Sequence, residues 1–164
     1  MTATQPTRKD IADFFRLGLL VGFCTPSEVA QWADRIVAAE ASPHIAFIEL
    51  CVSGSQPAST VQTLLGDVPG EATPDLAPHI LLGHSYRLIT SHAISAERAL
   101  RLLYPLSCGE SFSEDIRFTL SAYDDELSLA HQGVYRTVAD VIQQFITFLA
   151  DYESYAPDTS TVNA

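Results

Sequence analysis

The feature that most constrains this chain is a helix start at residues 25–28, followed by an apolar stripe at helical spacing. Thr25 is a favoured N-cap, Pro26 suits the first helical position, and Glu28 stands where a capping box requires it. The run that follows places apolar side chains on one face: Val29, Trp32, Ala33, Ile36 and Val37. The segment therefore predicts an amphipathic helix that buries the only tryptophan in a core.

Helix signals of the same kinds recur along the rest of the chain. We predict a helix from about residue 8 to Gly18 or Gly22 with Thr7 as cap, one over 60–65 ended by Gly66, and one over 74–91 with Thr73 as cap. A further helix over 95–103 should end before Pro105. The last three helices are predicted over 114–123 with Ser113 as cap, over 124–132 ended by Gly133, and over 137–153. Periodicity leaves 44–52 open between helix and buried strand, and its helical neighbours favour a helix. No Asn-Gly or Asp-Gly hairpin signal is present. We expect an all-α fold, a compact irregular bundle of about eight short to medium helices.

The length of 164 residues suits one domain. We expect a single helical domain over residues 1–155 and a flexible tail over 156–164. The first ten residues are polar, and no apolar stretch approaches the roughly 20 residues that a membrane span needs. We therefore expect a cytoplasmic protein that has no membrane partner.

The residue types that carry catalysis or bind metals do not form a familiar pattern. There is no glycine-rich phosphate loop, no H-E-x-x-H and no G-x-S-x-G. His79 and His84 are five residues apart, which is not the spacing that presents two imidazoles to one ion. Cys24, Cys51 and Cys108 form no C-x-x-C pair, and we expect them to be small buried apolar residues. The sequence predicts no enzyme, no metal and no cofactor.

Charge is the most informative bulk property of the chain. Twenty acidic residues face nine basic ones, for a net charge of −11, which argues against nucleic acid and anionic membranes as partners. Residues 110–158 hold ten acids against two arginines and so carry −8. One interpretation is a solvated face that keeps the protein in solution, and the other is a docking surface for a basic partner.

Three consecutive carboxylates, Asp124, Asp125 and Glu126, form the most suggestive cluster. Adjacent helical residues point about 100° apart, so the three cannot converge on one metal ion from a helix. Their place at the start of a predicted helix favours capping, with partner docking as the open alternative. Tyrosines among acids suit ligands rich in arginine and lysine, although they also pack at helix ends. The candidate partner-binding residues are Asp124, Asp125, Glu126, Glu114, Asp115, Tyr123 and Tyr135.

Four segments together carry a resemblance to a known group: EVAQWADRIV (28–37), IAFIELCVSG (45–54), SAERALRLLY (95–104) and YDDELSLAHQGVYRTVADVIQQFITFLADY (123–152). The chain resembles small acidic helical bacterial proteins, several of them similar to immunity proteins of polymorphic-toxin and contact-dependent inhibition systems. The resemblance implies a protein that binds and neutralises a cognate toxin, for example a nuclease, by covering its basic surface with an acidic face. It implies no catalytic residues.

Two other function classes stay open at this point. One is a structural or regulatory subunit that assembles through an apolar helix face. The other is an enzyme of unrecognised type with a carboxylate–histidine site around Asp125 and His131. The binding hypothesis is the leading one, because the chain has an acidic C-terminal third and lacks a catalytic pattern.

Overall fold

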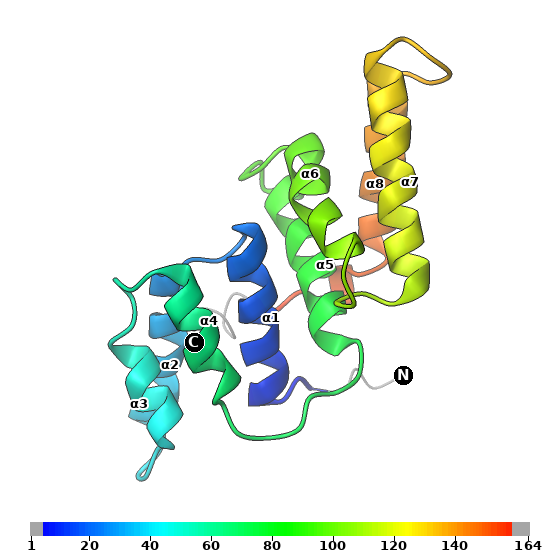
Figure 1. Cartoon of the computed structure of the whole chain (residues 1–164). Coiled ribbons are helices and arrows are strands. Elements are labelled where there is room, and N and C mark those ends of the chain that lie inside the picture. The colour runs from blue at the N-terminus through cyan, green and yellow to red at the C-terminus, as the bar shows by residue number, and fades with distance from the viewer. Residues whose placement is uncertain (1–4, 159–164) are drawn as a thin grey trace. The chain divides into compact units, whose positions relative to one another are not determined.

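A computed structural model describes residues 5–158, and within that range the chain is all-helical with no strand, as the sequence predicts (Figure 1). The eight α-helices and one 3-10 helix are α1 (Arg8–Val21), α2 (Pro26–Ala39), α3 (Ile45–Cys51), α4 (Ala58–Gly66), α5 (Leu76–Thr90), α6 (Ala96–Ser107), α7 (Glu114–His131), α8 (Val138–Ala150) and η1 (Glu153–Tyr155). The helix favoured over 44–52 is confirmed as α3.

The described residues group into two compact units. Residues 5–77 with 157 and 158 form the first unit, and residues 78–156 form the second. The expectation of a single domain over 1–155 stays a prediction. Ala156 is buried, so packed structure extends to that residue, while residues 159–164 of the predicted tail lie outside the described range.

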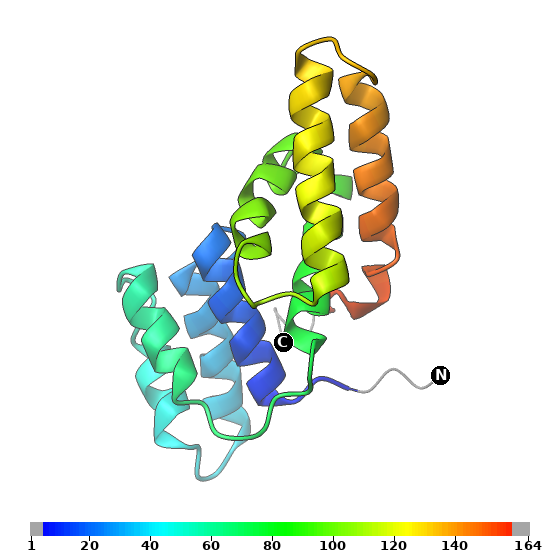
Figure 2. The same ribbon diagram turned by 45° about the vertical axis from the view of Figure 1, so that its right-hand side comes forward.

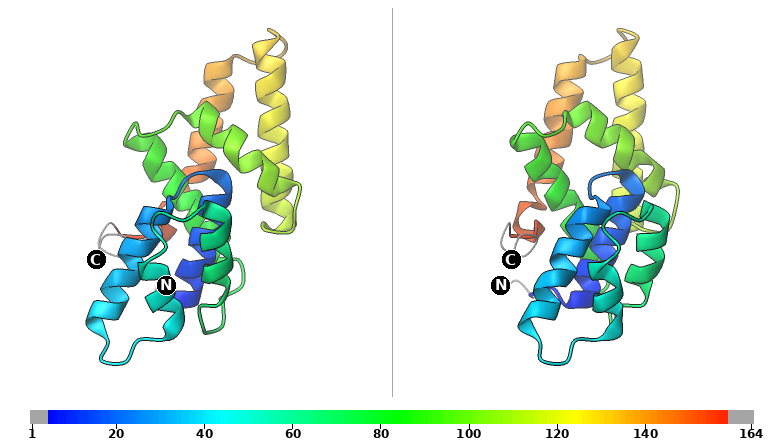
Figure 3. Two further views of the ribbon diagram at one scale, coloured as in Figure 1. Left: turned by 60° about the vertical axis from the view of Figure 1, so that its left-hand side comes forward. Right: turned by 90° about the vertical axis from the view of Figure 1, so that its left-hand side faces the viewer.

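The first unit is built from α1 to α4, with α2 packed on α3 and α1 on α4 (Figure 3). Its core contains a chain of aromatic rings in which Phe15 lies 5.3 Å from Phe14 and 5.4 Å from Trp32, measured between ring centroids. Trp32 in turn lies 5.6 Å from Phe47. The prediction that the apolar stripe of the 25–37 segment buries the tryptophan is confirmed, since Trp32 is almost fully buried.

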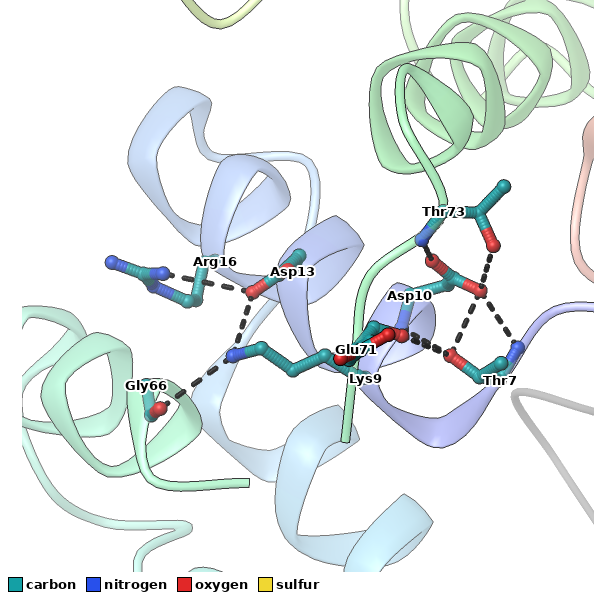
Figure 4. Close-up of polar contacts among 8 residues, drawn as sticks. All are labelled: Thr7, Lys9, Asp10, Asp13, Arg16, Gly66, Glu71 and Thr73. Atoms are coloured by element: carbon teal, nitrogen blue, oxygen red, sulfur yellow. Dashed lines mark hydrogen bonds and ion pairs between the residues drawn. The ribbon is translucent and has the colours of Figure 1, made fainter. Parts of the chain in front are cut away.

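A buried carboxylate ties the start of α1 to the loop before α5 (Figure 4). Asp10 accepts hydrogen bonds from the Thr7 backbone N–H at 2.8 Å and the Thr73 backbone N–H at 2.6 Å, and from both threonine hydroxyls. Thr7 caps α1 through the Asp10 N–H, so the two residues form a full capping box. Burial by itself would raise the pKa of Asp10, but the hydrogen bonds from Thr73 and Thr7 outweigh it and hold the pKa below its usual value.

The role predicted for Thr73 is therefore wrong. Thr73 binds Asp10, 63 residues earlier, and α5 begins only at Leu76. Asp75, directly before the helix, has a positive φ of 60°, which is not the extended backbone of an N-cap. The Thr73 side chain, which the local sequence predicts to cap α5, instead makes a long-range hydrogen bond to Asp10. The same limit of local signals applies to α4, which begins at Ala58, two residues before the predicted start.

The second unit contains most of α5, then α6, α7, α8 and η1. Helices α6 and α7 run antiparallel, with Ser107 Oγ 3.3 Å from Ser121 Oγ near one end and Glu97 bonded to His131 at the other. Helices α7 and α8 lie side by side and are joined by a turn over 132–137 (Figures 1 and 2). The core-facing residues of α7 are Ile116, Leu120, Leu127 and Ala130, and those of α8 are Val141, Phe145 and Leu149.

Helix α7 is one continuous helix of 18 residues, whereas the sequence predicts two helices that meet at 123–124. Leu120 and Leu127 are seven residues apart and both buried, so a single apolar stripe runs past the predicted break. Asp124, Asp125 and Glu126 consequently lie inside a helix and cap nothing, which makes the capping interpretation wrong. The predicted cap Ser113 also makes no side-chain capping bond.

Helix α6 passes through Pro105 and ends at Ser107, although the sequence predicts an end before the proline. The missing proline N–H removes only one bond, in the last turn of the helix. Leu103 and Leu106, three residues apart, are both buried and hold that turn in the core. Tertiary packing thus outweighs the local preference of the residue before proline.

Candidate partner-binding surface

The side of α7 that faces away from the core carries exposed apolar and acidic side chains together. Phe118 is 77% exposed and Leu129 is 42% exposed. With Ala122 and Asp125 they follow the spacing i, i+4, i+7 and i+11, which defines one face of a helix. We call this the outer face of α7, and its residues are Glu114, Asp115, Phe118, Ala122, Asp125 and Leu129. Phe118 and Leu129 thus add exposed apolar surface to a helix face whose carboxylates are also exposed.

Three of the predicted site residues lie on this outer face. Glu114 and Asp115 are exposed in the first turn of α7, and Asp125 is exposed about three turns further along. Asp124 is half-buried. The pKa of the Tyr104 hydroxyl on α6 is raised, first by Cys108, then by Asp124 and more weakly by Asp125. Of the three consecutive acids, Asp125 is the one that belongs to the outer face.

Two other predicted site residues are used inside the second unit. Tyr123 donates a hydrogen bond to the Gln144 carbonyl at 3.3 Å, and its ring packs on Phe145 and Phe148. Burial raises the pKa of Tyr123, and the charge of Glu126 raises it further. Glu126 forms an ion pair with Arg136 at 3.5 Å. Both residues join α7 to the turn or to α8, and neither belongs to the outer face.

The acids of the outer face have no basic partner within residues 5–158, where the only ion pair formed by an α7 carboxylate is the one from Glu126. The sequence count of −8 over 110–158 overstates the charge of the folded unit, however. The second unit as a whole holds ten acids and five arginines, for a net charge of −5, because α5 and α6 contribute Arg87, Arg98 and Arg101. The negative charge is least compensated on α7 itself.

His131 is held by a carboxylate other than the one proposed for it. Its Nε2 lies 3.0 Å from Glu97 of α6, which also pairs with Arg101 at 2.9 Å. The hydrogen bond with His131, ahead of that with Arg101, lowers the pKa of Glu97. No carboxylate–histidine pair forms around Asp125, and no group of three metal-ligating side chains occurs in the part of the chain that the structure describes.

The three cysteines differ in burial. Cys24 is buried, Cys51 is half-buried and Cys108 is exposed, so the expectation of three buried thiols is right only for Cys24. Burial raises the pKa of Cys24. Burial, followed by the hydrogen bond that the Cys51 thiol donates to the Asp34 carboxylate, raises the pKa of Cys51 to about 11. None of the three forms a disulfide.

Sequence reasoning missed Phe118 and Leu129. Phe118 lies opposite Leu120 already within the predicted 114–123 helix, and continuing that register past residue 124 places Leu129 on the same side as Phe118. Because the sequence predicts two helices that meet at residues 123 and 124, the shared face of the single helix was not recognised. Tyr135, the last predicted site residue, lies in the turn between α7 and α8 and is 80% exposed.

Comparisons with protein-family models, curated proteins and solved structures find no match to this chain. Among the described residues, no helix has both the length and the apolar character needed to cross a membrane. The resemblance to immunity proteins therefore stays a prediction.

Proposed function

We propose that this chain binds a basic partner protein through the outer face of α7 and neutralises that partner by covering its functional surface. The sequence suggests one specific version of this proposal. In it, the chain is an immunity protein, and its partner is a cognate toxin, for example a nuclease, with a basic active site. The interaction would take place in the cytoplasm. The observation that carries the proposal is the exposed Phe118 among the unpaired acids Glu114, Asp115 and Asp125.

The two kinds of side chain on this face would act at different steps of binding. Unpaired carboxylates steer a basic partner toward the surface and raise the association rate, an effect that salt screens. Burial of a large apolar side chain contributes about 1.5–3 kcal/mol, so Phe118 and Leu129 would mainly slow dissociation. An interface of a few apolar anchors inside a charged rim is the common arrangement in protein complexes.

The test uses the protein encoded by the adjacent gene as the purified binding partner and measures association by stopped flow at several salt concentrations. Asp115→Lys combined with Asp125→Lys, two changes on the outer face, should slow association about tenfold or more at low salt and flatten the salt dependence. Both side chains are exposed and form no ion pair within residues 5–158, so the variant should fold. Phe118→Ala should leave association unchanged and speed dissociation.

A matched control carries the same change in net charge on the first unit: Asp67→Lys combined with Glu71→Lys, both exposed positions. If association slows equally in this control, total charge and not the α7 surface guides the encounter. If the adjacent protein is harmless to cells and does not bind, the proposed neutralising role is contradicted. Co-expression supplies the second readout, since this chain should restore growth to cells that make the partner.

A second candidate function, a subunit that assembles through an apolar helix face, is favoured by one observation. The short helix α3 exposes Ile45 and Ile48, and Val52 directly after it is exposed at the same i, i+3, i+7 spacing. Ile48→Asp combined with Val52→Asp would then convert an oligomer into a monomer. Light scattering that finds a monomer at every concentration for the unaltered chain would rule out obligate self-assembly.

A further inference from the structure

The turn between α7 and α8 holds a tyrosine in a backbone conformation that side chains rarely adopt. Helix α7 ends regularly, because Gly133 has a positive φ and the Val134 N–H bonds back to the Leu129 carbonyl at 3.0 Å. The next residue is different. The Arg136 N–H bonds to the Val134 carbonyl at 3.0 Å, and Tyr135 between them has a φ of +74°. This combination is a classic γ-turn, a rare and strained conformation for a bulky residue.

The ring of Tyr135 rests against an arginine that both neighbouring helices contact. The Arg136 guanidinium lies over the ring at 5.4 Å from its centroid. The same guanidinium donates a hydrogen bond to the Gln144 side chain and pairs with Glu126 at 3.5 Å. Glu126 comes from α7 and Gln144 from α8, so both helices of the hairpin fix the arginine on which the tyrosine rests.

Packing within this chain gives no reason for the strain. Tyr135 is 80% exposed, its neighbour Val134 is also exposed, and glycine would satisfy the same turn at no steric cost. Backbone strain persists where the surrounding structure enforces it, and it is concentrated at binding and catalytic sites. A large, exposed aromatic ring on a tight turn, in contact with a guanidinium, has the properties of a binding anchor, because part of its conformational freedom is already restricted before association.

We propose that Tyr135 is a preorganised anchor that inserts into a pocket of the basic partner, an inference that rests on the proposed function. Charge complementarity favours the same partner at the turn as on the outer face of α7. Glu126 pairs with Arg136, the base next to Tyr135, and the acid Asp140 lies just beyond it. The positive charge of Arg136 is therefore compensated by nearby acids. A basic partner surface can approach the Tyr135 ring without meeting an unpaired positive charge.

The experiment measures two properties of the same variants: the melting temperature of the free protein and the affinity for the purified product of the adjacent gene. Tyr135→Gly removes both the strain and the ring, so it should raise the Tm by about 2–4 °C and weaken binding about tenfold or more. Tyr135→Phe keeps the ring and should retain binding. His92→Gly relieves a positive φ of 60° at another exposed position of the second unit. It is the matched control and should leave affinity unchanged.

The outcomes separate this inference from the proposed function. If charge reversal on α7 slows association while Tyr135→Gly binds as tightly as the unaltered chain, the anchor is overturned and the proposed function stands. If Tyr135→Gly does not raise the Tm, the premise of strain is wrong and the inference falls with it. If the unaltered chain does not bind the partner, both fail. If the chain forms a dimer and Tyr135→Gly dissociates it, the anchor binds a second copy of this chain, and the proposed basic partner is overturned.

Discussion

Replacing Asp10 by alanine should destabilise the first unit by about 2–4 kcal/mol. The change leaves two backbone N–H groups, of Thr7 and Thr73, without their acceptor, and each such loss costs about 1–3 kcal/mol when the group is shielded from water. It also breaks the capping box of α1, while the Thr7 hydroxyl still caps the helix. A loss of this size is a large fraction of the roughly 5–15 kcal/mol that holds a typical domain together.

The same carboxylate makes a prediction about pH. The pKa of Asp10 in the folded protein lies below its usual value of 3.8, so the charged form is the one that folding stabilises. Its contribution is fully present above about pH 4 and is lost as the pH falls through the lowered folded pKa. Asp10→Asn removes this titration. The difference in unfolding free energy between the unaltered protein and Asp10→Asn should therefore be constant near pH 7 and shrink below pH 4.

Urea denaturation followed by fluorescence suits this test, because the only tryptophan, Trp32, lies in the core of the first unit. The matched control is Asp13→Ala, three residues on. Within residues 5–158, the Asp13 carboxylate forms ion pairs with the side chains of Lys9 and Arg16. Such pairs near the surface contribute at most about 1 kcal/mol. If Asp10→Ala costs no more than Asp13→Ala, the reasoning from buried hydrogen bonds is refuted.

Three further predictions concern stability and can be checked by thermal or urea unfolding. Gly83→Ala should destabilise by about 1–3 kcal/mol, because a Cβ there would lie 2.3 Å from the Tyr152 carbonyl oxygen, a backbone atom that cannot easily move. Gly66→Ala should stabilise by about 0.5–1 kcal/mol, since it ends α4 with open space around it. Glu97→Gln should cost less than about 1 kcal/mol despite its contacts with His131 and Arg101, which are largely exposed.

Structure that is set by neighbouring residues could be predicted from the sequence. The capping box at Thr25 and Glu28 forms as predicted, with the Glu28 carboxylate on the Thr25 N–H at 2.6 Å. The end of α1 at Gly22 also follows its local signal, a left-handed C-cap. These elements are decided within one helical turn, where composition and spacing carry enough information.

Structure that depends on distant contacts could not be predicted in this way. Asp10 recruits Thr73 across 63 residues, which no local pattern reveals. Three acids in a row suggested a helix start at residue 124, but the buried leucines of α7 extend the helix through them. The acids Glu114, Asp115 and Asp125 of the outer face were named from the sequence as candidates, while their arrangement around Phe118 depends on α7 being unbroken.

Because the three thiols differ in burial, a dye can be attached selectively to one of them and used with the single tryptophan as a donor–acceptor pair. Thiolates are the reactive form, so a maleimide dye at neutral pH should label the exposed Cys108 well before Cys51 or Cys24. The dye would then sit in the second unit and the lone indole donor, Trp32, in the first. Resonance energy transfer between them would report any change in the separation of the two units when a ligand is added, with no residue introduced for the purpose.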